Sequence, residues 1–183
     1  MTDNVITPEF RAAFVGLFRP TAPRDNPNGA KKYSVRAVFM PDADLALLKQ
    51  QAKDAVTEKW PTNPPKNLRN PFRLNEELDS PIPGVPDDAI VMTFSANEDR
   101  RPGLVNAKLQ DIIDDSEVYS GAWFRAQVRA YAYEQAGNKG VAFGLQNIQK
   151  TRDDESLGRG QIPANKAFEA FGGGGKTAGA MFD

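Results

Sequence analysis

Apolar and polar residues alternate in several short segments of the chain, which is the pattern of strands with one buried face. These segments are residues 10–19, 32–40, 90–95, 122–133 and 141–150. Between residues 42 and 60 the apolar residues instead recur three or four positions apart, and Asp42 is a candidate N-cap, so we expect a helix there. The chain is therefore predicted to be mainly β, with one helix.

Proline and glycine mark the connections between these segments. Residues 61–86 contain seven prolines, which excludes a helix or a central strand there and predicts a long irregular loop. We expect a short helix at residues 163–171 and a flexible tail at residues 172–183, which begins with four glycines. The chain is thus predicted to have one domain, residues 1–171, and a tail. The strands favour an OB-type, five-stranded Greek-key barrel with one inserted helix.

The composition excludes several classes of chemistry. The chain has no cysteine and no histidine, so it has no disulfide, no Cys/His zinc site and no catalytic arrangement that uses histidine or a thiolate. Its 23 basic and 24 acidic side chains give a net charge of −1, so binding of a polyanion requires local segregation of charge. Such segregation exists, because residues 121–150 carry four basic side chains and one acidic one, a net of +3.

We expect a cytoplasmic protein. No apolar run reaches the length of a membrane span, and the first four residues do not resemble a signal peptide. No contact with a membrane is predicted.

The strand predicted at residues 122–133 separates two kinds of side chain. Its even positions are apolar and mostly small, whereas its odd positions are Trp123, Arg125, Gln127, Arg129, Tyr131 and Tyr133. A strand sends the two sets to opposite faces. Rings on which bases stack, together with cations for phosphates, are what a protein needs to hold a single-stranded nucleic acid without reading its sequence. The alternative is that a helix or loop covers this face, although alternating Arg, Gln and Arg argue against full burial.

Basic and aromatic residues are mixed more weakly around Tyr33 and Arg36 and again in residues 66–73, where a solvated strand end or loop is the simpler explanation. Acidic residues also cluster, at residues 87–88, 114–117 and 153–155. Because these are consecutive loop positions whose side chains point apart, solvated turns explain them better than a Mg²⁺ site. We therefore predict no catalytic residue, no metal site and no cofactor.

Residues 119–150, YSGAWFRAQVRAYAYEQAGNKGVAFGLQNIQK, carry a resemblance to a known family. The shared pattern is a YSG strand start, an alternating strand ending in YAY, and a GNKGVAFGL turn and return strand with a polar QK exit. The similarity extends to KYSV at residues 32–35 and covers roughly residues 10–170. In these features the chain resembles the short bacteriophage single-stranded-DNA-binding proteins with an OB fold.

The resemblance implies a protein that binds and protects single-stranded DNA (ssDNA) without sequence preference, in phage replication or recombination in the host cytoplasm, and without catalysis. Taken together with the strand face, it predicts these ssDNA-binding residues: Tyr33, Arg36, Trp123, Arg125, Arg129, Tyr131, Tyr133 and Lys139.

The predicted protein partners depend on the end of the chain. Met181, Phe182 and Asp183 form an apolar and acidic tip that suits capture by phage or host replication or recombination proteins. Related binding proteins often end in a long acidic tail, whereas this chain has no acidic residue between Glu169 and Asp183, so an end without a role is the alternative. Self-association on DNA stays open. A phage structural or assembly protein that uses the same aromatic face for protein contacts is the alternative function, and a Mg²⁺-dependent nuclease is a third.

Overall fold

The computed structural model describes residues 2–157, 168 and 171. In chain order the elements are β1 (Val5–Ile6), β2 (Phe10–Thr21), β3 (Lys32–Phe39), α1 (Ala46–Lys59), β4 (Arg73–Leu74), η1 (Asn75–Glu77), β5 (Ile90–Asn97), β6 (Gly103–Val105), η2 (Asp115–Glu117), β7 (Trp123–Gln135) and β8 (Asn138–Arg152). The predicted flexible tail at residues 172–183 lies outside the described residues. So does the helix predicted at residues 163–171, apart from positions 168 and 171.

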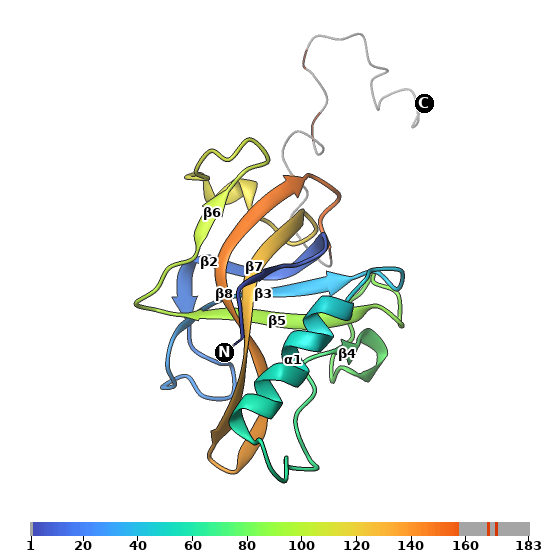
Figure 1. Cartoon of the computed structure of the whole chain (residues 1–183). Coiled ribbons are helices and arrows are strands. Elements are labelled where there is room, and N and C mark those ends of the chain that lie inside the picture. The colour runs from blue at the N-terminus through green and yellow to red at the C-terminus, as the bar shows by residue number, and fades with distance from the viewer. Residues whose placement is uncertain (1, 158–167, 169–170, 172–183) are drawn as a thin grey trace.

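The long strands close into a ring in the order β7-β2-β3-β5-β8, and pairing of β8 with β7 completes it (Figure 1). All neighbours in this ring are antiparallel except β5 and β8, which are parallel. Helix α1 is inserted between β3 and β5 in the chain. The predicted OB-type Greek-key barrel with one inserted helix is therefore confirmed.

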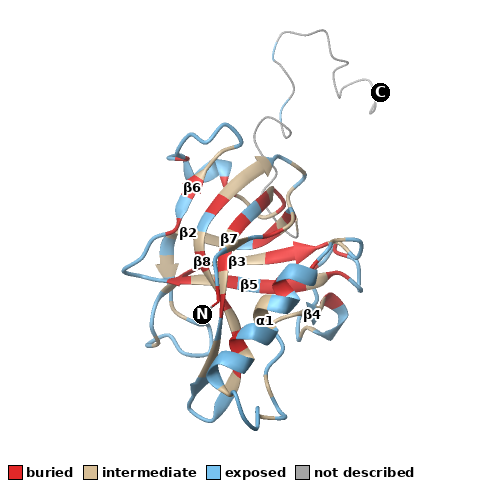
Figure 2. Ribbon diagram, in the orientation of Figure 1, coloured by how far each residue is buried: buried red, intermediate tan, exposed pale blue. Residues whose placement is uncertain are grey.

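Each strand of the ring contributes one fully buried phenylalanine to the inside of the barrel: Phe10, Phe39, Phe94, Phe124 and Phe143. The Phe10 ring meets the Phe39 and Phe94 rings edge-on, with centroids 5.5 and 5.7 Å apart. Burial of a phenylalanine contributes about 1.5–3 kcal/mol to folding, so this cluster is a large part of what holds the ring together. Figure 2 shows buried positions along the ring strands and exposed positions at the tip of the β7–β8 hairpin.

Helix α1 packs against β7 and β8 through a short apolar stripe that includes the buried Leu48 and Ala55. It begins at Ala46, later than the predicted start after Asp42, because a turn comes first in which the Ala43 N–H donates to the Met40 carbonyl. In the described part of the chain no helix, α1 included, is long and apolar enough to cross a membrane.

The proline-rich connection between α1 and β5 is ordered around a buried asparagine. The Asn75 carboxamide donates to the carbonyls of Ile82 and Val85 and accepts from the Ile82 N–H at 2.8 Å. This connection packs Ile82 and Val85 over one part of the outer face of the sheet, in a second apolar cluster with Ala13, Val38, Ala89 and Val91. Further along the outer face of β5, Thr93 and Asn97 are exposed.

Candidate nucleic-acid interface

A groove of about 940 Å³ lies on the outer face of the ring, between the β7–β8 hairpin, the C-terminal end of β5 and the C-terminal end of α1. Polar side chains of β5 form part of its floor: Thr93, Ser95 and Asn97. Its charged side chains are Lys32, Glu58, Lys59, Arg100 and Arg129. With four basic groups against one acidic group, the groove has a positive charge and suits a polyanion.

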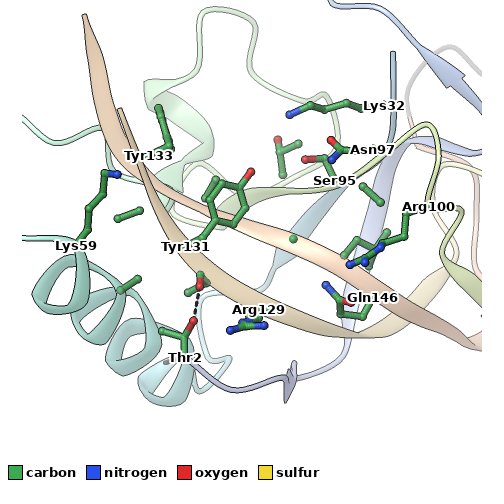
Figure 3. A pocket seen from close by; sticks show the side chains of 18 of the residues that line it. Thr2, Lys32, Lys59, Ser95, Asn97, Arg100, Arg129, Tyr131, Tyr133 and Gln146 are labelled. Carbon is green, nitrogen blue, oxygen red and sulfur yellow. Dashed lines mark hydrogen bonds between the residues drawn. The ribbon is translucent and has the colours of Figure 1, made fainter. Parts of the chain in front are cut away.

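Tyr131 stands at the centre of this groove (Figure 3). Its strand neighbour on β8 is Ala142, and a β-carbon added at Gly144 would lie 3.8 Å from the Tyr131 ring, so the small residues of β8 leave room for the ring. The side chain is 42% exposed. Figure 3 places Arg129 on one side of the ring and Tyr133 and Lys59 on the other. The ring therefore offers a surface for stacking with cations nearby.

Burial raises the pKa of the Tyr131 phenol, and Tyr133 beside it adds to the effect. Since an ordinary tyrosine titrates near pH 10, the phenol stays neutral under physiological conditions. The ring thus places no negative charge in the path of a phosphate backbone.

Among the residues that the structure describes, the four groove cations have no carboxylate partner: no ion pair involves Lys32, Lys59, Arg100 or Arg129. Lys59 lies 5.6 Å from the centroid of the Trp60 ring. Cations that are not neutralised within the protein are available to an external anion.

The structure divides the predicted β7 face into two parts. Arg129, Tyr131 and Tyr133 line the groove, whereas Trp123 and Arg125 lie outside its lining, toward the start of the strand. All these side chains point outward as predicted, since the residues that alternate with them in β7 as far as Ala130 are buried.

Trp123 and Arg125 are bonded to other parts of the chain. The Arg152 guanidinium lies 4.2 Å from the centroid of the Trp123 ring, and the indole N–H donates to Asp154 Oδ2 at 2.8 Å. Arg125 Nε donates to Gln149 Oε1 at 2.6 Å. One face of the indole is therefore already occupied by a cation.

The structure corrects the expectation for Tyr33. This side chain is only 8% exposed and belongs to the core cluster of the barrel. The physical reason is the alternation of β3, which places Tyr33 on the same face as Val35 and Ala37. Its ring has no open surface on which a base could stack.

Arg36 and Lys139 do not line the groove. Arg36 points outward and pairs in register with Thr93, a residue of the groove floor. Lys139, at the tip of the β7–β8 hairpin, lies outside the groove lining and makes an ion pair with Glu134 at 3.4 Å.

Sequence reasoning missed Lys59 and Arg100 and did not select Lys32 for the site. A signal existed for Lys32, because it has the same parity in β3 as Arg36 and so shares its outward face. Lys59 is the last residue of α1, and Arg100 follows β5 in a turn. Only the packing of these elements around the groove brings the two side chains into it.

The YSG motif has a structural role. Gly121 has a φ of +117°, and a side chain there would collide with the Glu155 carbonyl. Its N–H donates to the Ala12 carbonyl, while the Ser120 carbonyl accepts from the Leu157 N–H. The motif thus holds the segment after β8 against β2. In the part of the chain that is described, no group of three or more acidic side chains is placed to hold a metal ion.

Comparison with known proteins gives one family and several similar folds. A family model described as the ssDNA-binding protein of Enterobacter phage Enc34 matches residues 3–178. A search of curated proteins finds no match.

Among solved structures, the single-stranded DNA-binding protein from bacteriophage Enc34 in complex with ssDNA is 19% identical, with a TM-score of 0.69 over 85% of this chain and 89% of that chain. Another structure of the Enc34 protein is 19% identical, with a TM-score of 0.64 over 91% and 90%. The bacteriophage T7 single-stranded DNA binding protein gp2.5 is 12% identical, with a TM-score of 0.56 over 84% and 93%. The shared fold is that of these phage proteins.

Proposed function

Because the chain belongs to the family of the Enterobacter phage Enc34 ssDNA-binding protein, we propose that its groove around Tyr131 holds single-stranded DNA by base stacking and phosphate contacts. The family is one of DNA-binding proteins, not of enzymes. In this proposal the protein coats and protects single strands during phage replication or recombination, without sequence preference. The observation that carries the proposal is an exposed aromatic ring among cations that have no carboxylate partner in the described part of the chain.

Base stacking on Tyr131 supplies the part of the affinity that does not depend on salt. A base stacked on an aromatic side chain contributes about 1–3 kcal/mol, whatever the base, because every base has a π-face. Tyr133, on the same face of β7, extends the aromatic surface along the strand. Hydroxyl and amide groups of β5 line the floor opposite. They can bond to any base edge or phosphate and so add little sequence preference.

Phosphate contacts supply the part of the affinity that depends on salt concentration. Four groove cations, Lys32, Lys59, Arg100 and Arg129, allow up to four such contacts. With a slope of about −0.7 per contact on a single strand, log K falls with log salt concentration at about −2.8.

The predicted residues outside the groove have a secondary place in this proposal. Arg36 borders the groove through Thr93 and can meet the same strand. Trp123 and Arg125 have to give up bonds to Asp154 and Gln149 before they contact DNA. Lys139 has to leave Glu134. We therefore expect them to contribute less than Tyr131 and Arg129.

The test compares single-stranded and duplex oligonucleotides of equal length over a series of salt concentrations, by fluorescence anisotropy. A duplex hides the base faces, so the proposal requires strong preference for the single strand and similar affinities for mixed sequences. Equal affinity for both forms, with a steep salt dependence, would reduce the groove to an electrostatic patch and overturn the stacking mechanism.

Protein partners belong to the same proposal through the tip at Met181–Asp183, outside the described residues. Deletion of residues 172–183 should leave the affinity for ssDNA within about 0.5 kcal/mol, the usual range for surface changes. It should weaken binding to the phage's own replication or recombination proteins, measured with purified components. Unchanged binding to those proteins would remove the tip from the proposal.

A further inference from the structure

Phe14 is an aromatic side chain in an unusual position on β2. It is 62% exposed and has a φ of +54°, in the left-handed region that bulky residues rarely adopt. The register with β3 shifts between Ala13 and Val15, so Phe14 is the extra residue of a bulge, and its N–H donates to Ser120 Oγ at 3.3 Å. Bulges of this kind re-aim a side chain. The local backbone therefore holds a phenyl ring in solvent, where it makes no contribution to the core.

An arginine lies against this ring. The Arg36 guanidinium lies 5.0 Å from the ring centroid. Burial lowers the pKa of Arg36, and the positive charge of Arg24 nearby lowers it further. Within the described chain neither arginine has a carboxylate partner. A cation beside an aromatic ring, with no acid among the described residues to neutralise it, matches the needs of a nucleotide: a phosphate for the arginine and a base for the ring.

Arg36 differs in one respect from Arg152, which covers the ring of Trp123. Arg152 is bonded to Glu9 at 2.7 Å and so is fixed within the protein. Arg36 has no such bond to any described residue, so it can turn toward a phosphate while a base occupies the exposed part of Phe14.

The strand register connects this place with the groove. Arg36 pairs with Thr93 of the groove floor, and Ala142 pairs with Tyr131. Between β5 and β8 the inward residues Phe94 and Phe143 pair in parallel, so Thr93 and Ala142, which precede them, lie next to each other on the outer face. A row of outward side chains thus runs from Phe14 across β3, β5 and β8 to Tyr131. Four strand-to-strand steps of about 4.8 Å give a path of about 19 Å along the curved outer surface of the ring. On the other side of this row, Val38 and Val91 are buried under the proline-rich connection, so the row follows the edge of the open surface.

We propose that Phe14 and Arg36 form a second stacking subsite, which takes one unpaired base and its phosphate at the end of the ssDNA path away from Tyr131. The inference rests on the proposed function and adds a direction and a minimum length to it. A strand that occupies only the groove does not reach Phe14, and a longer strand does.

The test measures affinity against oligonucleotide length for the full-length protein and four variants, one of which, Tyr131→Ala, shows which lengths depend on the groove. Phe14→Leu keeps an apolar side chain without a π-face, Phe14→Trp keeps the π-face, and Leu47→Ala removes an equally exposed apolar side chain of α1 that lies outside the groove lining. OB folds cover about 4–16 nucleotides, so thymidine oligomers across that range are suitable. We expect Phe14→Leu to weaken binding of the longer oligomers about 5- to 150-fold, with no effect on the shortest oligomers that still depend on Tyr131. Phe14→Trp and Leu47→Ala should bind all lengths within about twofold of the unchanged protein.

A photochemical measurement gives the position directly. An oligomer with 5-iododeoxyuridine at one end, the other end or the middle is irradiated in complex with the unchanged protein, and the cross-linked peptide is identified by mass spectrometry. A cross-link to Phe14 is expected from one end of long oligomers and from no position of the shortest.

Several results would overturn the subsite. In the first, Phe14→Leu binds oligomers of every length with normal affinity, although Tyr131→Ala binds them more weakly. This result leaves the groove proposal intact. A second is equal weakening at every length with a lowered melting temperature, which makes Phe14 a residue of the fold. A third is normal DNA binding with loss of self-association in light scattering, which makes it a protein contact. Absence of ssDNA preference in the unchanged protein is a different outcome, because it removes the groove proposal itself.

Discussion

In the first half of β7 the outward side chains are bonded to the chain itself, and in the second half they face a groove. Trp123 is held between Arg152 and Asp154, and Arg152 is bonded to Glu9. Tyr131 instead stands exposed in the groove. The two halves share one alternation of apolar and outward residues. Alternation decides which face points outward, while partners from other parts of the chain decide whether that face is available to a ligand.

The difference can be expressed in free energy. A hydrogen bond to a charged group contributes about 1.5–3 kcal/mol, so the bond between the Trp123 indole and Asp154 opposes any move of that ring toward DNA. Stacking of one base returns about 1–3 kcal/mol, which is no more than the bond that is lost. Tyr131 has no such bond to break among the described residues. We therefore assign stability to the first half of β7 and binding to the second.

The largest expected effect is on DNA binding by Tyr131→Ala. Loss of the ring should weaken ssDNA binding by about 1–3 kcal/mol, or about 5- to 150-fold, and leave the salt dependence unchanged, because no charge is removed. Tyr131→Phe keeps the ring and serves as the control, with nearly normal affinity expected. Anisotropy titrations at several salt concentrations measure both quantities. Normal binding by Tyr131→Ala would move the binding centre out of the groove.

Trp123→Ala should show the opposite pattern. It removes the cation–π contact with Arg152 and the bond to Asp154, so we expect the free energy of unfolding to fall by about 2 kcal/mol. The affinity for ssDNA should stay within about 0.5 kcal/mol of the unchanged protein. Trp123→Phe keeps a ring beside Arg152 but has no N–H for Asp154. Its stability should therefore lie between that of the unchanged protein and that of Trp123→Ala. Urea unfolding gives the stabilities. A large loss of affinity at full stability would return Trp123 to the binding site.

A smaller contrast separates the two arginines of the same strand face. Arg129→Ala removes a groove cation and should reduce the salt slope of binding by about 0.7, the value for one phosphate contact. Arg125→Ala removes a cation that is bonded to Gln149 outside the groove lining, so the slope should stay nearly unchanged. Each variant is the matched control of the other. Equal reductions would show that the DNA follows the whole of β7.

The smallest effect concerns pH. The hydrogen bond from the Trp123 indole lowers the pKa of Asp154, and the backbone N–H of Glu155 also contributes. A lowered pKa in the folded state means that the ionised carboxylate stabilises the fold above its ordinary pKa, and that this stabilisation is lost as the pH falls through the lowered pKa. Unfolding measurements between about pH 6 and pH 3 should therefore show that the unchanged protein loses stability more steeply than Asp154→Asn. The difference should arise around the ordinary aspartate pKa and below it. Parallel curves would contradict the role of this bond.

The ring strands and the core were predictable because each strand alternates regularly. The period of two identified β3, β5, β7 and β8 to within a few residues, since a barrel strand buries one face and exposes the other. The same rule placed Tyr33 with Val35 on the inner face, so its assignment to the binding surface did not follow the alternation. The start of α1 was predicted too early because a turn between Met40 and Ala43 precedes the helix.

The extent of the candidate site was not predictable from local pattern. Trp123 is bonded to Asp154 and covered by Arg152, and both come from the segment that begins at the end of β8. Lys59 and Arg100 reach the groove only because α1 and β5 end beside it. Such placements arise from tertiary packing, which a strand's own sequence does not record.

The way in which the ring closes has a consequence for the synthesis of the protein. Phe10, near the start of the chain, pairs with Phe124 on β7, and β7 pairs in turn with β8. Pairing between residues so distant along the chain is slow, because a long loop has to close before the contact forms. A nascent chain without its last two strands leaves the edges of β2 and β5 unpaired, and such edges favour association with other chains. The groove is lined by residues of α1, β5, β7 and β8, so binding of DNA in it can begin only after β8 has been synthesised.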